Sequence, residues 1–89
     1  MRAVITVIGR DRVGIIAGIC TELAALGVNV LDISQTILQD VFTMNMLVDL
    51  AGSTADFAGV ADAVEKRGAA LGVRVHIQRE DIFDAMHKI

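Results

Sequence analysis

The sequence has no proline, no tryptophan and no tyrosine, and it has only three phenylalanines and one cysteine. Proteins that stack nucleic-acid bases need aromatic side chains, and proteins that bind phosphate backbones carry basic stripes. The formal net charge is −3, so the composition argues against a nucleic-acid partner. The single cysteine, Cys20, cannot form an internal disulfide, which fits a reducing compartment, and its apolar helical surroundings disfavour a role as a nucleophile.

Long apolar runs are also absent from the sequence. A helix that crosses a bilayer needs about 20 apolar residues, and no stretch approaches that length. The first residues lack the pattern of a secretory signal peptide, and no cluster of Lys and Arg indicates an anionic membrane surface. We therefore expect a cytoplasmic protein with no membrane partner.

The chain of 89 residues has a large share of apolar residues, 54%. A chain of this length is expected to form one domain, residues 1–89, with a small core. Part of the apolar surface must then be covered by something other than that core. The composition therefore predicts a homodimer or a higher homo-oligomer, with a lipid or ligand pocket as an alternative.

Apolar periodicity predicts four strands, over residues 2–8, 28–38, 42–50 and 73–79. It also predicts helices over residues 13–26 and from about residue 53 to 71, with Ser53 or Thr54 as the second N-cap and a glycine closing each helix. The order is β-α-β-β-α-β. The predicted fold class is therefore α+β, a ferredoxin-like sandwich with a four-stranded antiparallel sheet and two helices on one face. A short amphipathic C-terminal helix is predicted over residues 80–89 and is expected to dock on the sheet of this chain or of a partner.

The first two strands are expected to occupy different positions in the sheet. The first is apolar on both faces, which predicts a central strand. Along the second, one side carries Leu31, Ile33, Gln35 and Ile37, and the other carries Asp32, Ser34 and Thr36. This alternation predicts one face in the core and another that is either wet or in a dimer interface or polar pocket. The polar residues near the centre favour an edge strand or a bulge.

Residues 9–14, Gly-Arg-Asp-Arg-Val-Gly, join the first strand to the first helix. Such a turn exposes backbone N–H groups at a helix N-terminus, where the helix dipole favours an anion or a carboxylate. Two interpretations stay open. Either Asp11 caps the helix in an ordinary turn, or the turn binds a ligand.

The sequence resembles the ACT domain, a small regulatory module that binds amino acids. The matching segments are residues 5–8, 9–16 and 26–30: a strand, a polar loop with Asp, a basic residue and Gly before two aliphatic residues, and a helix end in Gly-aliphatic-Asn. It is more closely similar to stand-alone ACT proteins of bacteria and archaea, an uncharacterised family. That similarity rests on Asp-Ile-Ser-Gln-Thr at 32–36, Phe-Thr-Met at 42–44 and Ile-Phe-Asp-Ala-Met at 82–86. Val13 departs from the pattern, because many ACT domains have proline there.

The resemblance implies a ligand site. In ACT domains that bind amino acids, the first loop and the start of the second strand face the ligand, often across a subunit interface. The matching positions here are Gly9, Asp11, Val13, Gly14, Ile15 and Asn29. The N–H groups near Gly14 and Ile15 would hold the carboxylate, Asp11 would accept from the ammonium group, and the Asn29 amide donates or accepts. For Asn29, a hydrogen bond within its own turn is the alternative.

Three functional hypotheses follow. The first is a dimeric sensor of a small molecule, an amino acid, that acts on a separate protein partner, because no fused enzyme is expected in this chain. The second is a ligand-free dimerising protein-interaction module. The third is an acylphosphatase-like enzyme, in which Arg10 or Arg12 would cradle phosphate and Asn45 would orient water. We expect no catalytic residues and no cofactor. We also expect no metal site, because His76 and His87 are far apart in the sequence and lack the spacing of metal ligands.

Overall fold

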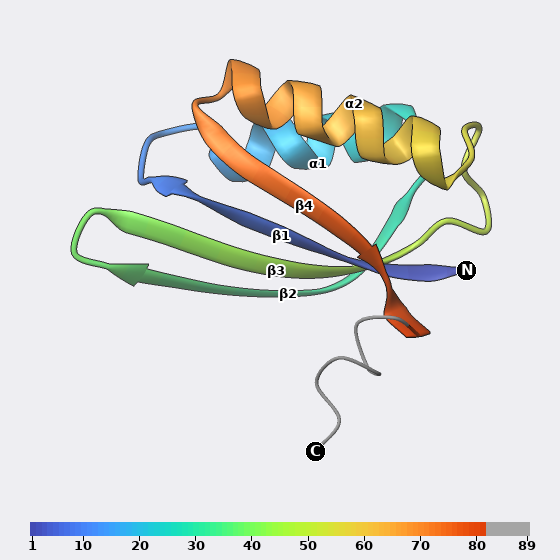
Figure 1. Ribbon diagram of the computed structural model, residues 1–89, viewed down its shortest axis with the longest axis horizontal. Helices are drawn as coiled ribbons and strands as arrows, with labels where there is room; N and C mark the ends of the chain where they lie inside the picture. Colours follow the sequence, from blue (N-terminus) through green and yellow to red (C-terminus); the bar gives the residue numbers. More distant parts are fainter. Residues whose placement is uncertain (82–89) are drawn as a thin grey trace.

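The computed structural model describes residues 1–81, which form a four-stranded antiparallel sheet with two helices on one face (Figure 1). The elements are β1 (Arg2–Arg10), α1 (Ile15–Ala25), β2 (Asn29–Leu38), β3 (Val41–Asp49), α2 (Phe57–Ala70) and β4 (Val73–Arg79). The strand order is β2-β3-β1-β4. The predicted ferredoxin-like βαββαβ fold is confirmed. The predicted C-terminal helix falls mostly on residues 82–89, which lie outside the described residues.

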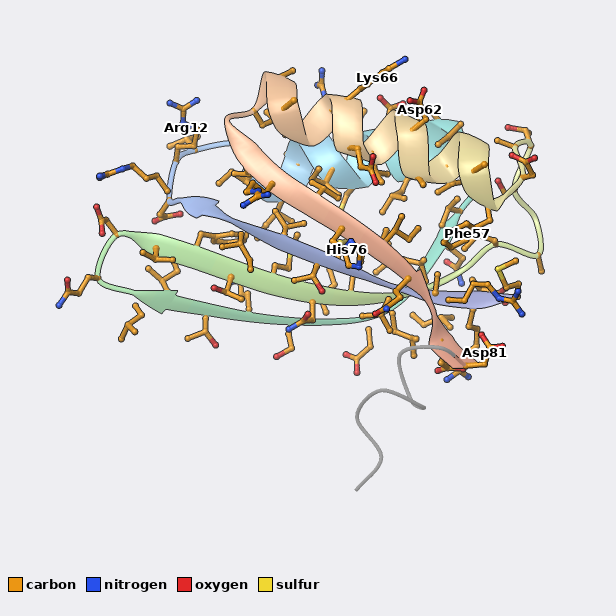
Figure 2. The ribbon with its side chains drawn as sticks, in the orientation of Figure 1. Arg12, Phe57, Asp62, Lys66, His76 and Asp81 are labelled. Atoms are coloured by element: carbon orange, nitrogen blue, oxygen red, sulfur yellow. The ribbon has the colours of Figure 1, made fainter. Side chains whose placement is uncertain are left out.

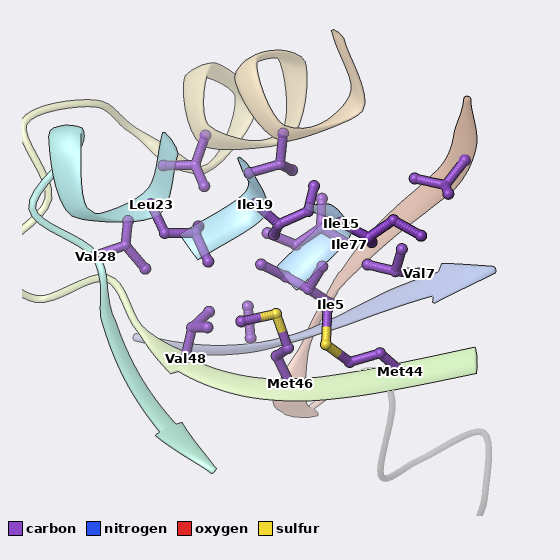
Figure 3. Close-up of a cluster of buried hydrophobic side chains, with 14 of the residues drawn as sticks. Ile5, Val7, Ile15, Ile19, Leu23, Val28, Met44, Met46, Val48 and Ile77 are labelled. Atoms are coloured by element: carbon purple, nitrogen blue, oxygen red, sulfur yellow. The ribbon is translucent and has the colours of Figure 1, made fainter. Parts of the chain in front are cut away.

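The core lies between the helices and the sheet (Figure 3). Alternate residues of three strands face the helices and are buried: Ala3, Ile5, Val7, Phe42, Met44, Met46, Val48, Val73 and Ile77. The helices contribute Ile15, Ile19, Leu23, Val60 and Val64. A methyl group on Gly18 of α1 would lie 2.7 Å from Leu71 Cδ1, so α1 closely approaches the end of α2 at this glycine. Within residues 1–81 no polar or charged side chain is buried.

β1 is a central strand, as predicted, and β2 is an edge strand that contains a bulge. The register of β2 against β3 shifts between Val30 and Asp32, which leaves Leu31 as the extra residue. Beyond the bulge, Ile33 pairs with Met46 and Ile37 pairs with Phe42. Because directly paired residues share a face, Ile33 and Ile37 lie on the helix side of the sheet.

The prediction that this side of β2 lies in the core is wrong. Ile33 is 41% exposed and Ile37 is 51% exposed, and residues 31–40 are all exposed. The strand residues buried under the helices belong to the other three strands. The helices therefore leave an apolar wall of β2 uncovered.

Both helices begin at residues other than those predicted. α1 begins at Ile15, and its N-cap residue is Gly14, with φ 93° and no side-chain hydrogen bond, so Asp11 is not the cap. α2 begins at Phe57. The Asp56 carboxylate accepts from the N–H of Gly59 at 2.8 Å, so the assignment of the cap to residue 53 or 54 is wrong. Neither helix within residues 1–81 is long and apolar enough to cross a membrane.

The second face of the sheet carries polar and apolar side chains side by side, and neither α1 nor α2 packs on it (Figure 1). We name it the open face. Strand pairing places on it Val4, Thr6, Ile8, Asp32, Ser34, Thr36, Thr43, Asn45, Leu47, Arg74, His76 and Gln78. One row, His76-Thr6-Asn45-Ser34, crosses all four strands.

Candidate functional site

The turn between β1 and α1 is anchored to two other turns. The N–H of Asp11 donates to the C=O of Asp40 at 2.8 Å, and Arg10 Nη1 lies 2.6 Å from Asp40 Oδ2. These contacts fasten the turn to the tip of the β2–β3 hairpin. On its other side, Arg12 Nη1 donates to the C=O of Leu71 at 3.3 Å, just before β4. The turn is therefore held between the hairpin tip and the end of α2.

A hollow of about 210 Å³ opens between this turn and β2, on the helix side of the sheet. We name it the loop hollow. It is lined by Asp11, Arg12, Gly14, Ile15, Ile16, Ala17, Gln35, Ile37 and Phe42. The uncovered side of β2 forms one of its walls. Its volume lies below the range of about 300–1,000 Å³ that is usual for drug-sized ligands, so it suits a small molecule.

The loop hollow offers free donors and free acceptors together. The first intrahelical hydrogen bond of α1 runs from the N–H of Gly18 to the C=O of Gly14 at 2.8 Å, so the N–H groups of residues 15–17 have no partner within the helix. Within residues 1–81, the Asp11 carboxylate and the Gln35 amide make no hydrogen bond or ion pair. The helix N-terminus suits an anionic group, and Asp11 suits a cationic one.

The structure brings three of the predicted site residues together, Asp11, Gly14 and Ile15, because all three line the loop hollow. Two others lie outside it. Gly9 belongs to β1, where a methyl group would lie 2.7 Å from Val73 Cγ1, so this glycine serves strand packing. The Val13 side chain is fully exposed and does not line the hollow.

Asn29 lies at the opposite end of the sheet from the loop hollow. It pairs with Asp49, which pairs with Arg2 at the start of β1, whereas the turn follows Arg10 at the end of β1. Eight residues of strand separate the two ends, which is roughly 26 Å. A single copy of the chain therefore does not bring Asn29 to the hollow. The Asn29 side chain makes no hydrogen bond within residues 1–81, so the alternative of a bond within its own turn is wrong.

Sequence reasoning missed most of the far wall of the hollow. Gln35, Ile37 and Phe42 come from the β2–β3 hairpin, which was not expected to meet the first turn. One usable indication was present. Gln35 is the polar residue on the otherwise apolar side of the second strand, and a polar group there needs a partner or a ligand.

The structure does not assemble the residues that an acylphosphatase-like reaction would need. Asn45 lies on the open face, where the Thr6 hydroxyl donates to its Oδ1 at 2.9 Å, whereas the loop hollow is on the helix side. Arg10 is paired with Asp40. In the part of the chain that the structure describes, no group of three or more His, Cys, Asp or Glu residues is placed to hold a metal ion.

The chain matches known protein sequences over nearly its whole length. A family model described as ACT domain matches residues 2–78. A UPF0237 protein of Listeria innocua is 51% identical over 89 residues, and the match covers 100% of both chains. A UPF0237 protein of Methanocaldococcus jannaschii is 52% identical over 88 residues, which is 99% of this chain and 98% of the relative. Similar sequences thus occur in a bacterium and an archaeon.

A solved structure has the same architecture. The ACT domain protein from Streptococcus pneumoniae superposes with a TM-score of 0.82 and 42% sequence identity. The match covers 98% of this chain and 98% of that chain. The likeness therefore extends over both the sheet and the helices that frame the loop hollow.

Proposed function

We propose a regulatory function from one premise: this chain belongs to the ACT domain family. We infer that it binds an amino acid, or a related small zwitterion, in the loop hollow. Binding then alters the association of the chain with a separate protein partner. The site is completed at an interface between two copies of the chain.

The observation that carries this proposal is that one small hollow contains both helical N–H groups and a carboxylate that have no partner within residues 1–81. The N–H groups of residues 15–17 suit the carboxylate of an amino acid. The Asp11 carboxylate and the Gln35 side-chain oxygen suit its ammonium group. Ile37 and Phe42 supply an apolar wall for a short side chain.

The second copy is proposed to pair along β2, because this edge has no neighbouring strand within residues 1–81 and carries several exposed apolar side chains. The exposed apolar side chains gathered there are Leu31, Ile33, Ile37, Leu38 and Val41. An edge strand of ten residues presents a row of N–H and C=O groups that another strand can bind. Two-fold dimers are the commonest homo-oligomers. Antiparallel pairing of two β2 strands would continue the sheet through both copies.

This pairing supplies Asn29 to the site from the second copy. β2 runs from Asn29 at one end of the sheet to Leu38 at the end near the turn. Antiparallel pairing reverses the direction of the second strand, so Asn29 of the partner subunit would lie beside Leu38. The proposed site therefore combines the loop hollow of one subunit with the start of β2 of its partner. The Asn29 side chain, which shares the open face with its pairing partner Asp49, would reach the ligand past the edge of the strand.

Thermal unfolding in the presence of each of the twenty amino acids, added one at a time, tests the proposal. Circular dichroism is the suitable probe, because the chain has no Trp or Tyr. A ligand at 100 times its dissociation constant adds about 2.7 kcal/mol to the free energy of unfolding. For a domain of this size the midpoint should rise by roughly 10–20 °C. We expect one amino acid, or a chemically related group of them, to give this rise.

Two variants and a control locate the site. Asp11→Asn and Asn29→Ala should each weaken the binding of that amino acid by about tenfold or more. The first removes the negative charge that faces the ammonium group, and the second removes a hydrogen bond to a charged group. Asp62→Asn, a change of the same kind on the exposed surface of α2, should leave the affinity unchanged. If no amino acid shifts the midpoint, a ligand-free dimerising module replaces the sensor. If both site variants keep the wild-type affinity, the site assignment is wrong.

A further inference from the structure

We propose a second ligand site, on the open face of the sheet, that binds the carboxylate or phosphate group of a small metabolite. A hollow of about 390 Å³ lies there, lined by Thr6, Ile8, Arg74, Val75 and His76. We name it the open-face hollow. It shares no lining residue with the loop hollow and lies on the opposite side of the sheet. The inference is independent of the function proposed for the loop hollow.

The alternation of β4 places two cationic or hydrogen-bonding side chains in this hollow. Val73 and Ile77 of β4 face the core, so Arg74 and His76 face the other way (Figure 2 labels His76). In the neighbouring strand β1, Arg74 is opposite Ile8 and His76 is opposite Thr6. Side chains directly opposite one another have Cβ atoms about 5 Å apart, so these four line one small area.

Arg74 stands out among the cations because nothing in residues 1–81 accounts for its charge. Arg2, Arg10, Lys66 and Arg79 each pair with a carboxylate, and Arg12 donates to a backbone carbonyl. Arg67 lies in the last turn of α2, where the helix dipole favours a cation. Arg74 makes no hydrogen bond or ion pair with any described residue, and the same is true of His76. In a chain of net charge −3, an unpaired arginine beside a histidine is an unusual local excess of donors.

The residues of the open-face hollow favour an oxyanion over other ligands. A guanidinium group binds carboxylate and phosphate oxygens through two parallel hydrogen bonds, and a ring N–H of His76 adds a third donor. The Thr6 hydroxyl already donates to Asn45, so it shapes the hollow and leaves donation to Arg74 and His76. Ile8, 46% exposed, offers an apolar contact for the rest of the ligand. Among the described residues, no acidic side chain lines the hollow to repel an anion.

Amide chemical shifts in an NMR titration test this site in the full chain. Sodium phosphate and sodium acetate are added in separate experiments at constant ionic strength. We expect saturable shifts of the amides of residues 6, 8, 74 and 76, with a dissociation constant on the order of 1 mM for a few charge-assisted hydrogen bonds. Saturation by either anion supports the site, and the tighter of the two identifies the preferred oxyanion.

Charge-matched variants separate a site from general attraction of anions. Arg74→Gln should weaken binding by about tenfold. Arg74→Lys keeps the charge but loses the two parallel N–H donors of the guanidinium group, so it should weaken binding less. Arg67→Gln removes the same charge from the exposed surface of α2 and should leave the affinity unchanged. Shifts that grow without saturation, or equal weakening by Arg67→Gln and Arg74→Gln, would overturn the proposal. Amino-acid binding in the loop hollow would instead move the amides of residues 11–17, so either site can fail alone.

Discussion

Gly14 and Gly27 both have positive φ angles, 93° and 74°, but they lie in different surroundings. A methyl carbon on Gly14 would have no heavy atom within 4 Å, whereas one on Gly27 would lie 2.6 Å from the carbonyl oxygen of Gly52. The first position therefore carries only the free-energy cost of a left-handed backbone. The second adds a clash with a backbone atom that belongs to another loop.

Alanine at each position measures the two costs separately. Gly14→Ala should lower the free energy of unfolding by about 1–2 kcal/mol, the usual cost of a left-handed alanine. Gly27→Ala should lower it by at least about 1 kcal/mol more, because crowding in a packed region adds to that cost. Urea unfolding followed by circular dichroism gives both values. Equal losses would mean that the loop at Gly52 moves aside at no cost, contrary to this expectation.

The role of Asp11 shows what residue patterns leave undecided. Its place in the first turn was predicted, but capping of α1 and contact with a ligand were both compatible with the spacing. The choice depends on where the helix begins, and Gly14 sets that point through its backbone. Within residues 1–81 the Asp11 carboxylate consequently has no hydrogen-bond partner beside the helix N-terminus, a fact that only three-dimensional placement reveals.

At the scale of the helix, the start of α2 rests on one carboxylate. Asp56 accepts from the N–H of Gly59, and its negative charge also complements the helix dipole. Asp56→Ala should therefore lower the free energy of unfolding by about 1 kcal/mol, as measured by urea unfolding. Asp62→Ala on the same helix loses only an exposed ion pair with Lys66, so its effect should stay below about 0.5 kcal/mol. A larger effect at Asp62 than at Asp56 would contradict this assignment of the cap.

At the scale of the strand, β2 shows which structural features the alternation of apolar and polar residues predicts and which it does not. The pattern correctly predicted an edge strand or a bulge, and both are present. It also assigned Ile33 and Ile37 to one side of the strand, which the register confirms. Alternation does not report whether a helix covers that side. Coverage depends on contacts between distant segments, such as Gly18 of α1 against Leu71 after α2, and these leave the β2 wall of the loop hollow open.

At the scale of the whole molecule, the proposed dimer is tested by charge on the β2 edge. Ile33→Lys should convert the dimer to a monomer, because dimerisation would bring two lysines together near the two-fold axis and bury their charges. Sedimentation equilibrium measures the mass directly. Ile8→Lys is the matched control: Ile8 is similarly exposed but lies on the open face of β1, so the dimer should persist. Dissociation by the control, or a dimeric Ile33→Lys variant, would contradict pairing through β2.

The separation of Asn29 from the turn was contained in the predicted topology. β1 and β2 are both antiparallel to β3, so they run in the same direction and their starts lie at one end of the sheet. Asn29 at the start of β2 must then lie far from the turn at the end of β1. The resemblance to ACT domains assigned Asn29 and the first turn to the same ligand site, whereas the strand directions place them at opposite ends of one subunit. The proposed two-fold partner would bring its own Asn29 to the end of the sheet where the turn lies. The number of subunits is a property that no pattern in one chain specifies.

The free edge of β2 also divides its backbone into two populations. In a strand with one neighbour, alternate N–H groups point inward to β3 and the others point outward to water. Hydrogen exchange distinguishes these populations, because only the inward amides must wait for local opening. A strand with neighbours on both sides has only the protected kind. If β2 is a free edge, every second amide along it should exchange quickly. If β2 pairs with a second copy, all of its amides should exchange slowly, so the pattern of exchange distinguishes the two states residue by residue.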